Sequence, residues 1–312
     1  MNREMSSTNT SEETIISWND ARIRLVGDYD IDIYEEKDED SDDELSQEMD
    51  CLETFSFRFP HPDYCKSNVI TKYDDGNNDK ASNQTKMISI ELKGFDMESG
   101  NVWSSTGVTL WRASGILCDY FLKHHSLLKR SKRVLELGAG LGLCGILAHH
   151  ITSSYVCLTD GDSHTLQLLR SNIQRNITTT TSTSTGDGEK RIQSKEIACH
   201  QLLWGRQYAL DFLERQSTRD EETTFDIIIG SDIIYAECIL QPLWETIKVL
   251  LTKEIGIFIM AFSSGRQVGP ISNVLDVAEN AGFSHKCVME DYRKCQQDEG
   301  VSIYLFRWKD DS

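Results

Sequence analysis

Hydrophobic positions recur in two alternating patterns along the second half of the chain. Short continuous apolar runs are typical of strands buried on both faces of a sheet, and they occur at residues 134–137, 155–158, 225–230 and 256–262. Apolar residues at helical spacing precede or separate these runs at residues 110–121, 141–149, 163–175, 242–251 and 271–281. Strands and helices that alternate in this order predict a parallel sheet with helices on its faces.

Three further segments complete the predicted sheet. Residues 196–203 form one strand, and residues 285–290 and 301–308 form the last two, joined by a polar turn at 293–300. A connection this short joins antiparallel strands. The prediction is therefore an α/β fold with seven strands that ends in an antiparallel hairpin, whereas a dinucleotide-binding fold has six strands, all parallel.

The chain before residue 106 predicts a small β region. Short strands are expected at residues 21–26, 54–59 and 87–92. We interpret residues 51–105 as a small N-terminal β-hairpin region packed on a main domain at 106–312. Within that domain, the Thr, Ser and Gly tract at 177–194 has no apolar period and is expected to be a low-complexity loop insert.

Most of the negative charge lies at the N-terminus. Residues 1–50 hold 17 Asp and Glu but four Lys and Arg, which accounts for 13 of the 18 net negative charges of the 312-residue chain. Repulsion among these charges predicts that residues 1–50 are an acidic, largely flexible segment. The balance disfavours nucleic acid, whose binding needs Lys and Arg against phosphates, and favours a basic protein partner.

Neither the cysteines nor the hydropathy indicates a metal centre or a membrane. The nine cysteines are scattered without C-x-x-C pairs, so buried free thiols are expected. The N-terminus lacks the apolar core of a secretory signal, and no apolar run approaches the roughly eighteen residues of a membrane span. We therefore expect a reducing compartment, the cytoplasm and also the nucleus, with no metal and no membrane contact.

The strongest chemical signal is the sequence VLELGAGLG at residues 134–142. Gly138 and Gly140 follow the predicted strand at once, and glycine lets a ligand lie almost against bare backbone. Asp160 closes the next strand about twenty residues on, where a carboxylate can accept hydrogen bonds from a ribose diol. This spacing predicts a cofactor that contains a nucleoside.

Two cofactor classes compete for this motif. Gly140, Gly142 and Gly145 also satisfy the G-x-G-x-x-G pattern of dinucleotide sites, but that match begins two residues too late after the strand. Glu136 stands before the loop, where it would repel a pyrophosphate and attract the cationic amino group of S-adenosylmethionine. The motif therefore favours a methyl donor over a dinucleotide, with a ligand-free glycine turn as the third interpretation.

The tips of two later strands carry further candidate residues. Trp204 is the third residue of the sequence LLWG at 202–205, and residues 231–235 read SDIIY from Ser231 onward. Open α/β folds build their sites at the carboxyl ends of strands. Trp204 can then stack on an adenine ring, although a tryptophan at the edge of the core is the alternative.

Asp232 and Tyr235 are candidates for holding a cationic amine. Three residues apart, they share a face if the chain turns helical after the strand. A carboxylate and a phenol can bind an ammonium group through charge-assisted hydrogen bonds and cation–π attraction. The alternative is a helix N-cap aspartate beside a packed tyrosine.

Taken together, ELGAGLG, the TD at residues 159–160, LLWG and the D-x-x-Y of 232–235 resemble methyltransferase family 16. This family comprises seven-strand protein lysine methyltransferases, including enzymes that act on elongation factors, calmodulin and chaperones. The resemblance covers residues 87–308 and implies a class I, Rossmann-like methyltransferase sheet. The segment TGVTLWRAS at 106–114 also resembles the part of the family that lays a tryptophan near the cofactor. One departure is Leu203, because the family often has an acid at that position.

The resemblance also implies roles for individual residues. It assigns Glu136, Gly138 and Gly140 to the methionine end of S-adenosyl-L-methionine and Asp160 to its ribose. Trp111, Trp204 and Ser231 would complete the cofactor site, with Trp204 beside the adenosine. Asp232 and Tyr235 would face the incoming lysine as the catalytic pair.

The hypothesis from the sequence is a monomeric, S-adenosylmethionine-dependent protein-lysine N-methyltransferase. Its substrate would be a protein, for example a basic protein or a translation factor. Water would remove the proton from the amine, because neither histidine nor lysine stands in the motif at 231–235. The alternatives are a methyltransferase for histidine or for a small molecule, and a non-catalytic S-adenosylmethionine-binding protein that docks on a basic partner.

Overall fold

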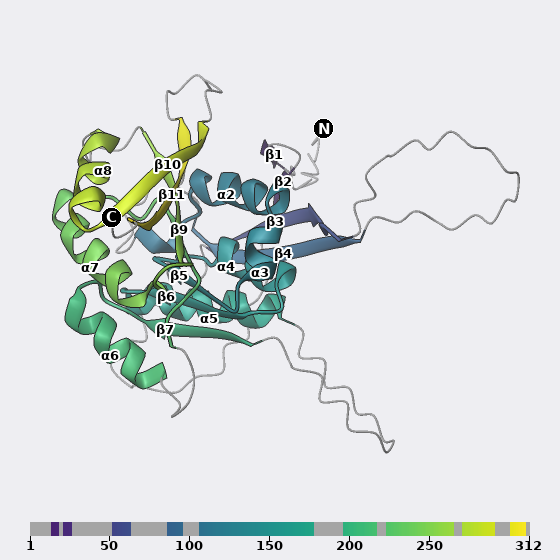
Figure 1. Ribbon diagram of the computed structural model, residues 1–312. Coiled ribbons are helices and arrows are strands. Elements are labelled where there is room, and N and C mark those ends of the chain that lie inside the picture. The colour runs from purple at the N-terminus through teal and green to yellow at the C-terminus, as the bar shows by residue number, and fades with distance from the viewer. Residues whose placement is uncertain are drawn as a thin grey trace, which may run out of the picture.

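A computed structural model describes the parts of the chain that form the sheets, their helices and the loops between them. The described residues are 14–18, 21–26, 52–63, 86–95, 106–177, 196–216, 223–264, 270–290 and 300–309. Of residues 14–18 and 21–26 and of Glu290, the backbone alone is described. Figure 1 shows one large sheet between two groups of helices, with a smaller sheet beside it.

The large sheet has seven strands in the order β10-β11-β9-β8-β5-β6-β7. Its strands are β5 Arg133–Leu137, β6 Tyr155–Asp160, β7 Ile197–Gln201, β8 Ile227–Ser231, β9 Ile257–Ser263, β10 Phe283–Glu290 and β11 Val301–Trp308. The first five are parallel, and β11 is antiparallel to both β9 and β10. The predicted sheet with an antiparallel terminal hairpin is therefore confirmed.

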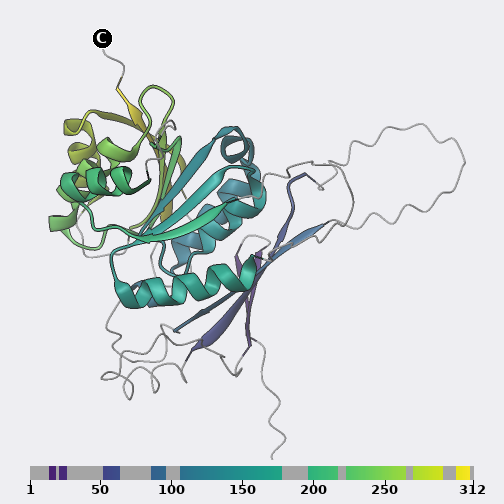
Figure 2. The ribbon, with the colours of Figure 1, turned by 90° about the horizontal axis from the view of Figure 1, so that it is seen from below.

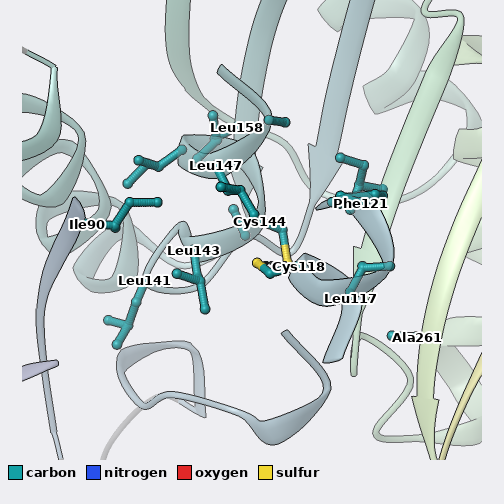
Figure 3. Packing of buried hydrophobic residues seen from close by; sticks show 14 of the residues in the cluster. Ile90, Leu117, Cys118, Phe121, Leu141, Leu143, Cys144, Leu147, Leu158 and Ala261 are labelled. Atoms are coloured by element: carbon teal, nitrogen blue, oxygen red, sulfur yellow. Dashed lines mark hydrogen bonds between the residues drawn. The ribbon is translucent and has the colours of Figure 1, made fainter. Parts of the chain in front are cut away.

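Helices cover both faces of this sheet (Figure 1). One hydrophobic cluster joins one face to α2 Arg112–Lys123, α3 Ser126–Arg130, α4 Leu143–Ile151 and α5 Ser163–Asn176. The other cluster joins the opposite face to α6 Arg206–Gln216, α7 Leu240–Leu250 and α8 Ile271–Asn280. Figure 3 shows the first cluster, where Cys118 of α2 and Cys144 of α4 meet with their sulfur atoms 3.9 Å apart.

A second, smaller sheet is antiparallel and has the order β1-β2-β3-β4. Its strands are β1 Thr14–Trp18, β2 Ala21–Val26, β3 Glu53–Pro60 and β4 Met87–Gly94. Along β4, Ile88, Ile90 and Leu92 are buried and alternate with exposed residues, which is the period of a strand with one packed face. Figure 2 shows this sheet beside α5, which contacts β4.

Three predictions need correction or stay open. The prediction omitted α6, and the chain after β8 does not turn helical at once, because the 3-10 helix Glu237–Ile239 begins only after Ala236. The division at residues 50 and 105 stays a prediction, and β1 and β2 lie within the segment interpreted as largely flexible. Residues 27–50 and, except for Ile177, the insert at 177–194 lie outside the described residues.

Neither a membrane-spanning helix nor a metal-binding cluster occurs among the described residues. None of the helices in these parts of the chain is long and apolar enough to cross a bilayer. Among the same residues, no group of three or more His, Cys, Asp or Glu side chains is placed to hold a metal ion.

Candidate active site

A pocket of about 600 Å³ opens where β5, β6, β7 and β8 reach their carboxyl ends. All nine residues predicted from the sequence line it: Trp111, Glu136, Gly138, Gly140, Asp160, Trp204, Ser231, Asp232 and Tyr235. They come from distant parts of the chain, and the order of the parallel strands brings them together.

The loop after β5 forms one wall, and it depends on glycine. Gly138, Gly140 and Gly142 have φ values of +58°, +53° and +90°, where side chains with a Cβ are strained. A Cβ on Gly138 would lie 2.9 Å from Cγ2 of Ile233, and one on Gly140 would lie 3.0 Å from the carbonyl oxygen of Gly107. Glycine therefore lets the loop pack closely on Ile233 and Gly107, while Gly138 and Gly140 still line the pocket with backbone alone.

Glu136 lies beneath this loop and is 2% exposed. Its Oε2 atom accepts a hydrogen bond of 2.8 Å from the backbone N–H of Gly145, at the start of α4. Burial raises the pKa of Glu136 to about 8, and the Gly145 hydrogen bond only partly offsets this. A cation in the pocket would favour the ionised carboxylate, so Glu136 is suited to a positively charged ligand.

Asp160 ends β6 and holds the glycine loop from the side. Its Oδ2 accepts from the N–H of Gly140 at 3.1 Å, and its Oδ1 accepts from the N–H of Asp162 at 3.1 Å. Burial raises the pKa of Asp160, and these backbone hydrogen bonds lower it. Each carboxylate oxygen has a second lone pair, so Asp160 can still accept hydrogen bonds from a diol.

Two tryptophans border the loop. Cζ2 of Trp204 lies 3.5 Å from the point where a Cβ on Gly138 would stand, so this indole packs against the first glycine. Trp111 precedes α2, and its Nε1–H donates to the carbonyl oxygen of Thr106 at 2.9 Å. The hydrogen bond fixes the indole beside Gly107, which packs on Gly140.

At the tip of β8, the geometry of Asp232 differs from the expected one. Asp232 has φ +52° and is neither helical nor an N-cap, so the prediction that a helix puts it on one face with Tyr235 is wrong. Its carboxylate accepts from the N–H of Ser263 at 3.0 Å and from the Ser263 hydroxyl at 2.8 Å. These bonds hold Asp232 against the end of β9, and it still lines the pocket.

Ser231 and Tyr235 flank this aspartate. The hydroxyl of Ser231 is buried and has no hydrogen-bond partner among the described residues, so it is available to a ligand. Tyr235 is 56% exposed at the mouth of the pocket. Burial of part of its ring and the charge of Asp160 raise the pKa of Tyr235, so its phenol remains protonated at neutral pH.

The charged side chains that line the pocket among the described residues are all acidic. Four carboxylates line it, those of Glu136, Asp160, Asp162 and Asp232, and none of the described lining residues is Lys, Arg or His. A pyrophosphate would find no cationic partner in this lining, whereas a sulfonium or an ammonium would be attracted. This lining therefore argues against the dinucleotide interpretation.

Sequence reasoning missed Tyr208, which lies on α6 and is 51% exposed at the pocket. The signal was present, because Ala209 and Phe212 are buried and Leu213 is partly buried, which is helical spacing. The exposed Tyr208 and Leu210 interrupt this period, so the pattern of the tract does not by itself indicate a helix with one buried face.

The sequence around this pocket matches a known family. A family model described as lysine methyltransferase matches residues 93–268, which is more than half of the chain. The chain belongs to this family. The match confirms the resemblance predicted from the sequence, and the predicted cofactor, S-adenosyl-L-methionine, agrees with it.

Individual relatives match between about half and three fifths of the chain. The chain is 28% identical over 168 residues to Protein N-lysine methyltransferase METTL21A of Xenopus tropicalis, which covers 53% of this chain and 66% of the relative. It is 31% identical over 163 residues to a Calmodulin-lysine N-methyltransferase of Arabidopsis thaliana, covering 52% and 46%. For Protein-lysine N-methyltransferase EFM6 of Saccharomyces cerevisiae the identity is 28% over 205 residues, covering 58% and 75%. The chain thus spans about half to two thirds of the first two relatives.

The lining residues fit this cofactor. Gly138 and Gly140 leave backbone exposed to it, and Glu136 offers a carboxylate to its amino group. The buried hydroxyl of Ser231, which lacks a partner among the described residues, supplies a further hydrogen-bonding group.

Proposed function

We propose that this protein is an S-adenosyl-L-methionine-dependent protein-lysine N-methyltransferase. The observation that carries the proposal is a pocket with a glycine loop at one end and two exposed tyrosines at the other. Among the described lining residues, the charged side chains are all carboxylates. Both reactants of such a transfer are cations before reaction, and this lining attracts both.

The chemistry needs alignment more than covalent help. When bound, the cofactor supplies an electrophilic methyl group, and the protein must hold a neutral amine in line with it. Asp232 is suited to orient that amine, because Ser263 fixes its carboxylate with two hydrogen bonds. We assign removal of the amine proton to water, since no histidine or lysine is among the described lining residues.

The mouth of the pocket supports a protein substrate. Leu203, Tyr208 and Tyr235 line the pocket and are 46%, 51% and 56% exposed. Exposed apolar side chains that cluster around a cavity are typical of a surface that binds another protein. The chemistry of this mouth favours a lysine with apolar neighbours in a basic segment, and a translation factor or another basic protein in the cytoplasm would provide one.

A carboxylate-to-amide substitution at Asp232 tests the proposal. Asn tolerates positive φ and keeps the shape of the side chain, so Asp232→Asn should leave the fold intact. We expect it to abolish transfer of labelled methyl from S-adenosylmethionine to protein in a lysate, while calorimetry shows unchanged donor affinity. Glu237→Gln is the matched control, because Glu237 is exposed beside the mouth, does not line the pocket, and should keep its activity.

The same experiment separates the alternatives. If the labelled methyl group were found on a histidine or on a small molecule, that group, and not lysine, would be the acceptor. Tight donor binding by the native protein without any label would indicate a non-catalytic binding protein. Full labelling by Asp232→Asn would contradict the role given to Asp232.

A further inference from the structure

Two asparagines of α5 bind the outer edge of β4 in the same way. Asn176 accepts from the N–H of Glu91 at 2.8 Å and donates to its carbonyl oxygen at 2.7 Å. Asn172 accepts from the N–H of Lys93 at 2.7 Å and donates to its carbonyl oxygen at 3.0 Å. Four residues of helix rise about 6 Å and two residues of strand about 6.6 Å, so the two spacings match.

The second proton of each amide separates the two asparagines. Asn176 donates it to the carbonyl oxygen of Asn172, within the same helix, at 2.7 Å. Asn172 donates it to the carbonyl oxygen of Leu141 at 3.1 Å. Leu141 belongs to the glycine loop and lines the cofactor pocket. Asn172, which is 0% exposed, therefore joins β4 to that loop.

The loop is held on two sides at this point. Gly140 donates its N–H to Asp160, and the next residue, Leu141, accepts through its carbonyl from Asn172. One side chain fixes the loop toward the sheet and the other fixes it toward the helix. Loss of either bond would leave a backbone group of the loop without its partner.

The end of β4 also packs directly on this loop. A Cβ on Gly94 would lie 2.3 Å from Cδ1 of Leu141, so the leucine side chain rests against bare backbone. The following residue, Phe95, donates its N–H to the carbonyl oxygen of Val108 at 2.9 Å, in the segment that packs on Gly140. Figure 3 shows Leu141 and Ile90 of β4 in the same buried cluster.

We propose that Asn172 is a positioning residue for methyl-donor binding, which acts by holding Leu141 and the glycine loop against β4. The end of the small sheet is then part of the donor-binding apparatus, although the family model begins only at residue 93. Asn176 binds the same strand without reaching the loop, and it contributes to stability alone.

The two asparagines provide a matched pair for the test. Asn172→Ala and Asn176→Ala each remove the two hydrogen bonds to β4, so both should lower the melting temperature. We expect Asn172→Ala to raise the dissociation constant of S-adenosylhomocysteine at least about tenfold in calorimetry, and Asn176→Ala to raise it less than about threefold. With S-adenosylmethionine in labelling assays, Asn172→Ala should raise KM and keep most of kcat, because a repositioned loop weakens binding before it affects the transfer.

A second variant keeps the proposal testable if Asn172→Ala does not fold. Gly94→Ala leaves both asparagines in place and pushes Leu141 away from β4. It should therefore raise the dissociation constant of S-adenosylhomocysteine by about as much as Asn172→Ala does. Equal dissociation constants for the two asparagine variants, or a folded Gly94→Ala with native affinity, would overturn the proposal. Failure of the native protein to bind the probe would instead contradict the assigned cofactor.

Discussion

At the donor end of the pocket, Glu136 is buried and Asp160 is partly buried, and both accept hydrogen bonds from backbone N–H groups. At the mouth, by contrast, Tyr208 and Tyr235 are more than half exposed. The donor end is therefore rigid before a ligand arrives, and its geometry admits one kind of cofactor. The mouth presents apolar surface with few fixed bonds. The difference indicates that the fold fixes the geometry of the donor end. Under the proposed function, the exposed mouth is where a protein substrate would be selected.

The strongest prediction tests the rigidity of the donor end. An alanine at residue 138 would adopt φ +58°, at a cost of about 1–2 kcal/mol, and its Cβ would press on Ile233 and Trp204. Overpacking against Ile233 adds about 1–3 kcal/mol. If the loop shifts to relieve both costs, we expect Gly138→Ala to weaken S-adenosylhomocysteine binding by at least about thirtyfold, the equivalent of about 2 kcal/mol.

Gly282→Ala is the control for this strain. Gly282 has φ +96° after α8, and nothing lies within 4 Å of the place where its Cβ would stand. It should lose stability and keep its donor affinity. Equal donor affinity in Gly138→Ala and the native protein would mean that the cofactor does not approach this loop.

A substitution at the mouth should affect the protein substrate alone. Tyr208→Ala removes an exposed ring worth about 1–2 kcal/mol at an interface, so we expect KM for the labelled protein to rise about fivefold to thirtyfold. Leu210→Ala is the matched control, since Leu210 is 40% exposed on the same helix and does not line the pocket. If Tyr208→Ala changed the affinity for the methyl donor, the donor end and the mouth of the pocket would not act separately.

The pH dependence of donor binding should be smaller. Glu136 has a pKa of about 8, so it is protonated at pH 6 and must lose that proton to face a cation. Binding therefore releases a proton, and donor affinity should rise between pH 6 and 7.5 by no more than about tenfold per unit. Calorimetry in buffers of different ionisation enthalpy measures how many protons are released on binding. In Glu136→Gln, the donor affinity should change less with pH.

The same group gives the weakest predicted effect, on stability without ligand. A carboxyl whose pKa is raised in the folded state stabilises fully below pH 4.5, and this contribution is lost as pH rises through about 8. Glu136→Gln stays neutral and should gain melting temperature relative to the native protein as pH rises from 6 to 8.5. A constant difference would show that Glu136 does not titrate in this range.

The contrast between the two ends also explains what the sequence predicted. The glycine loop and Asp160 were found because their geometry depends on local spacing after a strand, and the parallel order of strands then placed Trp204 and Ser231 correctly. Tyr208 is not predicted, because the exposed Tyr208 and Leu210 interrupt the buried period of α6. The carboxylate of Asp232 turns toward Ser263 of β9, a partner 31 residues away that no local pattern reveals. The role of Asn172 was also beyond local reasoning, since it joins Lys93 to Leu141 across two sheets.

The most direct test of the central claim is to identify the methylated atom. Lysate from cells that lack this protein is incubated with the purified protein and labelled S-adenosylmethionine, and the labelled band is analysed by mass spectrometry after proteolysis. The account predicts methyl groups on the ε-nitrogen of a lysine, absent when Asp232→Asn replaces the native protein. Methyl groups on histidine, or donor binding without any labelled protein, would contradict it.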